Sequence, residues 1–232
     1  MEYLFSFFIG SIFGSFIAVI LYRRPKNIKY VFGRSKCENC NYTIPYYYNI
    51  PIISFLILKG KCKNCNVKIN YNNLFYEILC GLVSLYIFNI YGLSFNYILR
   101  FFQMLIIVLI IFSDILEKDI YIIDMFLLFI IEFIYKIYNN NLNINNLKYA
   151  LIFFFIMLLL YILTKSIGMG DVILSFVIGF FFDNIYYVFL IFRMSFFLGA
   201  IVSIVLILSK KKTKKDYIAF SPYLLISLLY YL

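Results

Sequence analysis

The sequence predicts an all-α polytopic membrane protein, with about eight transmembrane helices and one cysteine-rich aqueous loop between the first two. Of the 232 residues, 64% are hydrophobic and 22% aromatic, and the mean hydropathy is +0.92. A soluble domain with a polar surface cannot have this composition. The apolar residues also fall into long runs separated by short polar segments, as in helices that cross a bilayer.

The first apolar run, residues 3–22, is long enough to cross a bilayer. We do not expect it to be a signal peptide, because Met1-Glu2 provides no basic segment before it, it has no small-residue cleavage site, and two arginines follow it. Small residues recur along it at a four-residue spacing, which predicts close packing against another helix. They are Gly10, Ser11, Gly14 and Ser15.

Seven further apolar runs predict seven more helices. They cover residues 74–91, 97–113, 120–138, 147–163, 172–182, 185–208 and 217–232. The run at 172–182 is too short to span an average bilayer, so either it begins earlier or Asp171 lies in a cavity and the helix need not reach lipid. The chain is therefore divided into a first helix (1–22), a loop domain (23–73) and a helical membrane domain (74–232).

The net charge of +10 is unevenly distributed. Ten Lys or Arg residues lie in 23–73 and five Lys residues in 210–215. When the loops between the apolar runs are numbered from the N-terminus, these are the first and the seventh, and the even-numbered loops are nearly free of Lys and Arg. By the positive-inside rule the odd-numbered loops are cytoplasmic and both termini lie outside. Membrane orientation and anionic headgroups explain the positive charge, so we expect no nucleic-acid partner.

Four cysteines form two matched pairs, Cys37-x-x-Cys40 and Cys62-x-x-Cys65, separated by 21 residues. Two such knuckles can supply the four corners of a tetrahedron, and the chain has no His, so the pattern predicts a structural four-thiolate zinc site. Two disulfides or a redox pair are the alternative, but a cytoplasmic loop is reducing. Cys80 falls inside a predicted helix and is expected to be a buried apolar residue.

The absence of His also removes the usual base of serine and cysteine hydrolases, so proton transfer would depend largely on carboxylates. Glu117 and Asp119 lie among loop charges and are expected to be solvated. Five other carboxylates lie in or at the membrane, where such groups are functional by default. They are Glu77, Asp114, Asp124, Glu132 and Asp171.

Asp114 and Asp171 stand out among these carboxylates. Asp114 ends the third apolar run, and Asp171 begins the sixth after a turn containing Gly168 and Gly170, so both are predicted at the cytoplasmic face. Two neighbouring carboxyls share a proton, so one can act as a base on water and the other as an acid towards a carbonyl, as in an aspartyl protease. The alternative is that each Asp only solvates or caps a helix end.

Several motifs, taken in order, resemble the type IV prepilin leader peptidases, a bifunctional prepilin peptidase/N-methyltransferase family of membrane aspartyl proteases. The resemblance covers nearly the whole chain. The motifs are Gly14-Ser15-Phe16, the two cysteine knuckles, Asn49-Ile50-Pro51-Ile52, Glu77, Asp114, Gly168-Met169-Gly170-Asp171 and Phe220-Ser221-Pro222.

The resemblance implies cleavage of the basic leader of prepilins or pseudopilins at the cytoplasmic face of the bacterial plasma membrane, with Asp114 and Asp171 as the catalytic pair. It also implies N-methylation of the new terminus with S-adenosylmethionine, and prepilins and the bilayer as partners. The possible substrate or methyl-donor region contains Glu77, Arg23 and Asn49, although the start of a helix is the preferred interpretation of Glu77.

The chain departs from the family pattern at several positions. Ala18 stands where the family commonly has Asn, Tyr121 and Ile122 where it has Pro followed by Asp or Asn, and Ile173 where a Lys is frequent. These departures bear on methyl transfer and on the electrostatics around the second Asp.

Two other functions remain open. A membrane anchor could present the zinc knuckle to cytoplasmic partners without catalysis. A transporter could relay protons through the remaining intramembrane carboxylates, Glu77, Asp124 and Glu132.

Overall fold

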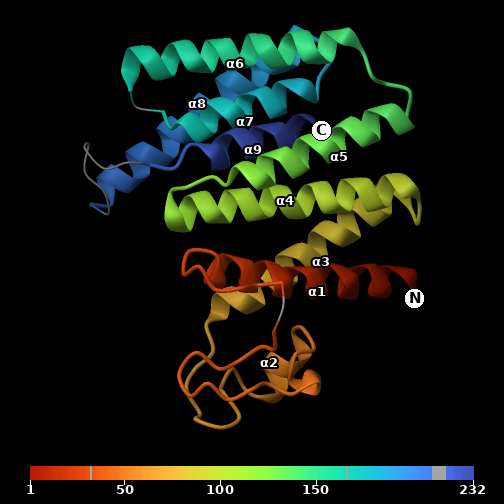
Figure 1. The fold of residues 1–232 in the computed structure, drawn as a ribbon, viewed down its shortest axis with the longest axis vertical. Helices are drawn as coiled ribbons and strands as arrows, with labels where there is room; N and C mark the ends of the chain where they lie inside the picture. Colours follow the sequence, from red (N-terminus) through yellow and green to blue (C-terminus); the bar gives the residue numbers. More distant parts are fainter. Residues whose placement is uncertain (32, 166, 211–217) are drawn as a thin grey trace. The chain divides into compact units, whose positions relative to one another are not determined.

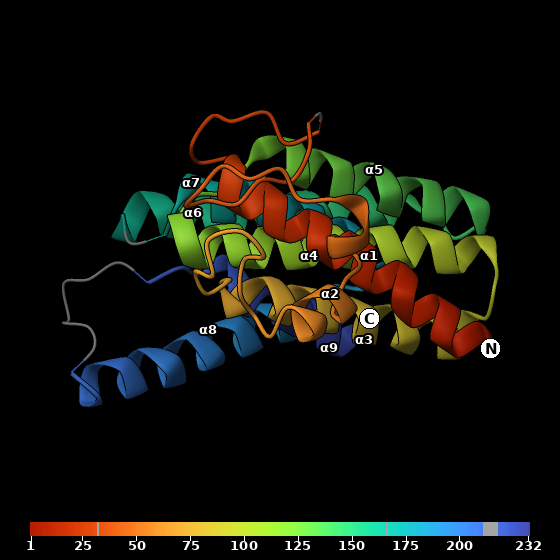
Figure 2. The same ribbon diagram turned by 90° about the horizontal axis from the view of Figure 1, so that it is seen from below.

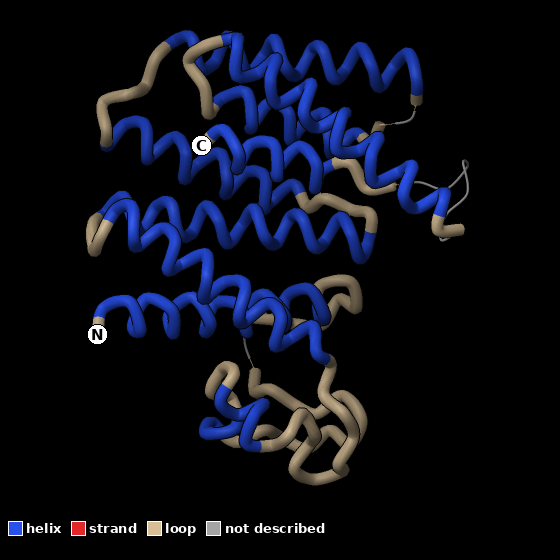
Figure 3. The backbone as a smooth tube through the Cα atoms, turned by 180° about the vertical axis from the view of Figure 1, so that it is seen from behind, coloured by secondary structure: helices blue, strands red, loops and turns tan. Residues whose placement is uncertain are grey.

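The computed structural model describes residues 1–31, 33–165, 167–210 and 218–232. Within these ranges the chain is helical, and Figure 3 shows no strand. Two isolated β-bridges, Lys36 with Thr43 and Lys61 with Lys68, are the only extended pairings there. The prediction of an all-α chain is confirmed. The predicted basic cluster at 211–215 lies outside the described residues.

The helices follow the predicted apolar runs in order (Figure 1). They are α1 (Glu2–Arg23), the short η1 (Tyr46–Tyr48) and α2 (Ile53–Ile57) of the loop, α3 (Tyr71–Tyr91), α4 (Phe95–Glu117), α5 (Ile122–Tyr138), α6 (Ile144–Thr164), α7 (Met169–Phe180), α8 (Ile185–Leu208) and α9 (Ser221–Tyr231). Of these, α1, α3, α4, α6 and α8 are long and apolar enough to cross a membrane. The count of eight spans stays a prediction.

Two helix ends differ from the predicted ones in a way that matters for the site. Helix α3 begins three residues early because the Asn70 side chain caps it, accepting the Asn72 N–H at 3.0 Å. Helix α4 continues to Glu117 and ends where Lys118 adopts a φ of 58°. Asp114 therefore lies almost one turn inside a helix, not at its end as predicted.

The chain forms two compact units, Met1–Leu105 and Ile106–Leu232, with the boundary inside α4. This division groups helices by packing, whereas the three predicted segments separate aqueous from membrane parts, and those segments remain predictions. The cysteine loop belongs to the first unit, and Figure 1 shows it leaving the end of α1 and returning to the start of α3.

In the first unit α1 and α3 approach at backbone distance. A Cβ at Gly10 or Gly14 would overlap the backbone of α3, and one at Gly81 would meet the Ser11 hydroxyl. The predicted packing role of the small residues is therefore confirmed. Cys80 lies at this contact with 0% exposure, so its predicted burial is confirmed as well.

In the second unit α7 packs along α6, and a Cβ at Gly179 would meet the backbone of Ala150 (Figures 1 and 2). At the end of α7, the Lys136 ammonium donates to the Phe181 carbonyl at 2.9 Å, and the Asn146 amide donates to the next carbonyl at the same distance. These contacts satisfy carbonyl groups that have no partner within the helix. With 12 residues, or about 18 Å, α7 is buried among other helices, which favours the predicted alternative that it need not reach lipid.

Candidate functional site

Two carboxylic acids far apart in sequence are buried inside the second unit. Asp114 lies in the last part of α4 and Asp171 in the first turn of α7, with exposed fractions of 2% and 1%. The charge of Asp114 acts on Asp171, so the two side chains are close enough to interact electrostatically. The fold therefore brings the predicted pair together, and their catalytic role remains a proposal.

The carboxylate of Asp114 is held by the start of α9. Its Oδ2 atom accepts two hydrogen bonds from Ser221, one from the backbone N–H at 3.1 Å and one from the hydroxyl at 2.6 Å. Ser221 is the first residue of α9, where backbone N–H groups have no partner within the helix. The sequence indicated this segment only as part of a family motif, and the available signal was a small polar residue directly before a proline at a helix start.

Asp171 has a different environment. As the third residue of α7 it turns back to the helix start, and its Oδ2 atom accepts the Gly168 N–H at 3.2 Å. Its Oδ1 atom is buried and has no hydrogen-bond partner among the residues that the structure describes. Helix capping therefore accounts for one oxygen of this carboxyl group and leaves the other unexplained.

Of the two glycines before Asp171, Gly168 has an ordinary backbone conformation and Gly170 makes a close packing contact. Gly168 has a φ of −76°, which any residue can adopt. Gly170 faces the loop between α4 and α5, where a Cβ would lie 3.2 Å from Cδ1 of Ile120. The expectation of a glycine turn beside Asp171 thus holds for its position, but its physical reason is the contact with Ile120.

The other carboxylates of this unit are placed as follows. Asp124 and Glu132 are buried, and Glu132 pairs with Lys136 at 3.7 Å. Asp119 is exposed, as predicted. The prediction that Glu117 is solvated is wrong, because its Oε2 atom accepts the Tyr121 hydroxyl at 2.6 Å and its Oε1 atom is buried.

The four predicted metal ligands come together in the first unit. The sulfur atoms of Cys37, Cys40, Cys62 and Cys65 all lie within 4.8 Å of one another. The Cys37–Cys65 sulfur separation is 3.8 Å and the Cys40–Cys62 separation is 4.0 Å. A tetrahedron with Zn–S bonds of about 2.3 Å has sulfur separations of about 3.8 Å. The cluster therefore fits a four-coordinate metal ion and is consistent with zinc.

The two knuckles have the same local structure. Each first cysteine donates its N–H to the carbonyl five residues later, Cys37 to Tyr42 and Cys62 to Val67, both at 2.9 Å. An Asn follows each second cysteine with positive φ, 55° at Asn41 and 57° at residue 66, a conformation that Asn tolerates. This repeat fixes the two loops around the cluster.

Backbone N–H groups also favour the thiolate form of two of these ligands. The Cys65 backbone N–H is the main cause that lowers the pKa of the Cys62 thiol. The Val67 backbone N–H is the main cause that lowers the pKa of the Cys65 thiol. Because a metal binds the thiolate, this arrangement suits the predicted role of the knuckles.

The remaining predicted residues line a cavity of about 180 Å³ between α1, the cysteine loop and α3, which contains Arg23, Asn49, Glu77 and Ala18 in its wall. The polar groups of Arg23 and Asn49 also form hydrogen bonds with other residues of the loop. The Arg23 guanidinium donates to the Lys29 and Arg34 carbonyls at 3.2 and 3.3 Å, and the Asn49 amide donates to the Ser35 hydroxyl at 3.0 Å. These groups thus shape the loop around the cavity.

Glu77 has a specific contact in this wall. Its Oε2 atom accepts the Ile52 N–H at 2.7 Å. It is the seventh residue of α3, beyond the first turn where the helix dipole acts, so the preferred helix-start interpretation is wrong. Ile52 has φ 61° and ψ −53°, and Ile53 donates its N–H to the Pro51 carbonyl, which makes a strained γ-turn.

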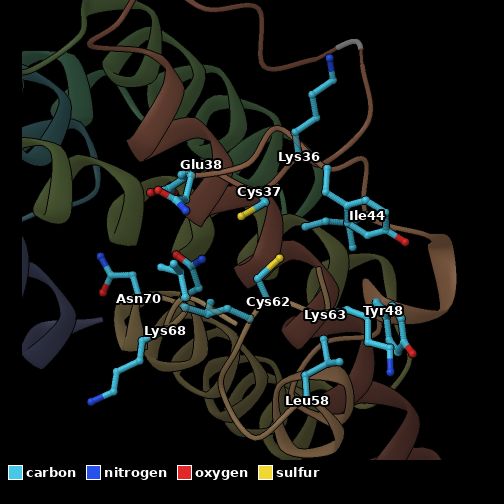
Figure 4. A pocket seen from close by; sticks show the side chains of 15 residues that line it. Lys36, Cys37, Glu38, Ile44, Tyr48, Leu58, Cys62, Lys63, Lys68 and Asn70 are labelled. Carbon is cyan, nitrogen blue, oxygen red and sulfur yellow. The ribbon is translucent and has the colours of Figure 1, made fainter. Parts of the chain in front are cut away.

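A second cavity of about 370 Å³ adjoins the first beside the metal cluster. The two cavities share wall residues that include Lys36, Glu38 and Tyr48. Figure 4 looks into the larger one and shows the sulfur atoms of Cys37 and Cys62 turned towards each other, with the Lys36 side chain extending outward.

Comparison with known proteins finds matches to the N-terminal part of the chain. Residues 8–91 match the family model described as the bacterial peptidase A24 N-terminal domain. This segment is therefore similar to A24 N-terminal domains. The prepilin leader peptidase/N-methyltransferase of Myxococcus xanthus (strain DK1622) is 33% identical to the chain over 79 residues. These two findings confirm the resemblance to prepilin peptidases.

The extent of these matches sets what they support. The aligned part is 34% of this chain and 24% of the Myxococcus xanthus protein, so the chain matches about a quarter of that relative's length. The matched segment, called the A24 domain below, contains the four cysteines, Arg23, Asn49 and Glu77, and it ends before Asp114 and Asp171. No solved structure matches the chain.

Proposed function

We propose that this chain is a membrane aspartyl endopeptidase that removes the leader peptide of prepilins or pseudopilins. The observation that carries the proposal is the pair Asp114 and Asp171, two buried carboxyl groups that interact electrostatically and have different hydrogen-bond environments. Ionisable groups inside a membrane protein are costly to bury, and two of them within electrostatic range of each other are candidates for a catalytic site. The A24 domain and its relative support the substrate class.

The chemistry requires a water molecule, an acid and a base at one peptide bond. A pair of carboxyl groups sharing one proton supplies both the acid and the base. The orphaned Oδ1 atom of Asp171 is available for a hydrogen bond to a substrate group, because capping uses only the other oxygen of this carboxyl. Neither acid needs a metal ion or a histidine for this reaction.

We place the reaction at the cytoplasmic face of the bacterial plasma membrane. The ten basic residues of the cysteine loop favour a cytoplasmic position of that loop, and by helix count both termini then lie outside. A basic leader stays on the same side while the apolar part of the substrate remains in lipid. The scissile bond would thus lie where the two acids meet water.

We assign the four cysteines a structural zinc site. A closed site with four protein ligands leaves no open position for catalysis. The ion would hold the two knuckles together and fix the loop that walls both cavities. Zinc binding would therefore stabilise the A24 domain.

N-methylation of the new terminus is the second proposed activity. It rests on the cavity of about 180 Å³ that Arg23, Asn49 and Glu77 line, joined by the larger cavity beside it. Acidic, basic and aromatic groups in these walls fit a zwitterionic nucleoside such as S-adenosylmethionine, which would supply the methyl group. Ala18 in the same wall lacks the amide that the family commonly has there.

Co-expression of the chain with a prepilin tests both activities. Mass spectrometry of the pilin is expected to show a terminus created by cleavage after the basic leader, and a mass increase of one methyl group if the second activity is present. Asp114→Asn and Asp171→Asn should each abolish processing with the protein still inserted. Processing in either variant would contradict the peptidase proposal.

The other two functions predict different results. A zinc-knuckle anchor without catalysis predicts that both Asp variants behave normally and that only the cysteine variants lose function. A transporter predicts ion flux in reconstituted vesicles that depends on Glu77, Asp124 or Glu132.

A further inference from the structure

The two acids of the proposed dyad are not equivalent. Both hydrogen bonds from Ser221 go to one oxygen of Asp114, Oδ2, and the shorter one measures 2.6 Å. Hydrogen bonds donated to a carboxylate oxygen favour its charged form, so this arrangement stabilises the ionised state of Asp114. Ser221 is itself 0% exposed, so these bonds are shielded from bulk solvent.

Asp171 shows the opposite pattern. One of its oxygens accepts a single backbone N–H at 3.2 Å, and the other is buried with no partner in the described part of the chain. An ionised oxygen left in that position would lack any donor and lie near the charge of Asp114. A proton on that oxygen turns it into a donor that can bind a substrate carbonyl.

We propose that Ser221 is a positioning residue that fixes the roles of the two acids: it holds Asp114 as the ionised base and leaves the proton on Asp171. The proposal rests on the peptidase function and adds the division of labour within the dyad. Ser221 does not touch the substrate in this scheme. It acts through the carboxylate that it binds.

The reaction then has a defined direction. Asp114 takes a proton from water, the water oxygen bonds to the carbonyl carbon, and the Asp171 proton passes to the carbonyl oxygen, giving a gem-diol. When the gem-diol breaks down, the proton on Asp114 passes to the amide nitrogen, the C–N bond breaks, and one hydroxyl proton returns to Asp171. The products are a carboxylic acid and an amine, and both acids regain their starting state.

Infrared difference spectroscopy of Ser221→Ala against the unsubstituted protein tests the assignment without measuring cleavage. Loss of the hydroxyl is expected to shift the stretching bands of an ionised carboxylate. A shift in the carbonyl band of a protonated carboxyl group would overturn the proposal. Ser227→Ala is the matched control, because this serine is also buried in α9 but donates to the Tyr223 carbonyl at 2.7 Å and not to a carboxylate.

Cleavage kinetics supply the second readout. Ser221→Ala should lower kcat about tenfold or more, the range expected on losing a hydrogen bond to a charged group, with KM for the prepilin nearly unchanged. Ser221→Thr keeps the hydroxyl and should recover most of kcat. An unchanged kcat in Ser221→Ala would overturn the positioning role while Asp114→Asn could still be inactive, so failure of this inference is distinguishable from failure of the peptidase proposal.

Discussion

The contact between Glu77 and the strained turn at Ile52 gives a prediction that is independent of any enzymatic activity. Removing the carboxylate by Glu77→Ala leaves the Ile52 N–H without its acceptor at 2.7 Å. A hydrogen bond to a charged group contributes about 1.5–3 kcal/mol, and part of this is offset because the turn can relax from a backbone conformation that costs about 1–3 kcal/mol. We expect the free energy of unfolding of the first unit to fall by about 1–2 kcal/mol.

The assay uses a thiol inside the same unit. Cys80 is fully buried at the α1–α3 contact, so its labelling by a maleimide, quantified by peptide mass spectrometry against temperature, reports the unfolding of this unit. A loss of 1–2 kcal/mol corresponds to a midpoint lower by roughly 4–8 °C or more for a domain of this size.

Glu77→Gln keeps an acceptor of the same shape and should lower the midpoint less. Glu38→Ala, which removes an exposed acid of the cysteine loop in the same unit, is the control and should leave the midpoint nearly unchanged. Equal midpoints for the alanine variants of Glu77 and Glu38 would refute the role of this contact.

Further predictions concern the metal cluster and the end of α7. Purified protein should contain one zinc ion per chain by elemental analysis. Cys62→Ser should lose the ion, and the control Cys80→Ser should keep it. Equal zinc contents in the two variants would exclude the four-cysteine site. Lys136→Met should lower the stability of the second unit by about 3 kcal/mol, because it removes the donor to the Phe181 carbonyl and the cation beside a buried carboxylate. Lys148→Met, a change of an exposed cation, should be nearly neutral in the same thermal assay.

Much of this fold could be predicted because hydrophobic burial in a bilayer imposes long apolar runs. The two knuckles could be predicted as well, since the spacing of four cysteines determines which ligands can share one ion. The small-residue spacing around Gly10 and Gly14 predicted a close helix contact for the same kind of local reason. In each case the signal lies within a short stretch of sequence.

The details of the candidate site depend on contacts between distant segments, so the sequence alone did not provide them. Ser221 binds a carboxylate 107 positions away. Glu77 was predicted near a helix start because the apolar run begins at residue 74. The cap at Asn70 moves the start three residues earlier and leaves Glu77 inside the helix. Glu117 was expected in water, yet α4 continues to this residue and the Tyr121 hydroxyl covers one of its oxygens. Hydropathy cannot register a cap or a hydroxyl contact of this kind.

The central claim is that Asp114 and Asp171 together cleave one peptide bond. Its most direct test is single-turnover cleavage of a purified prepilin by the protein in liposomes. The test compares Asp114→Asn and Asp171→Asn with Asp183→Asn, a change of an exposed carboxylate in the α7–α8 loop. We expect no detectable cleavage with either dyad variant and an unchanged rate with Asp183→Asn. Cleavage at the normal rate by either dyad variant would contradict the claim.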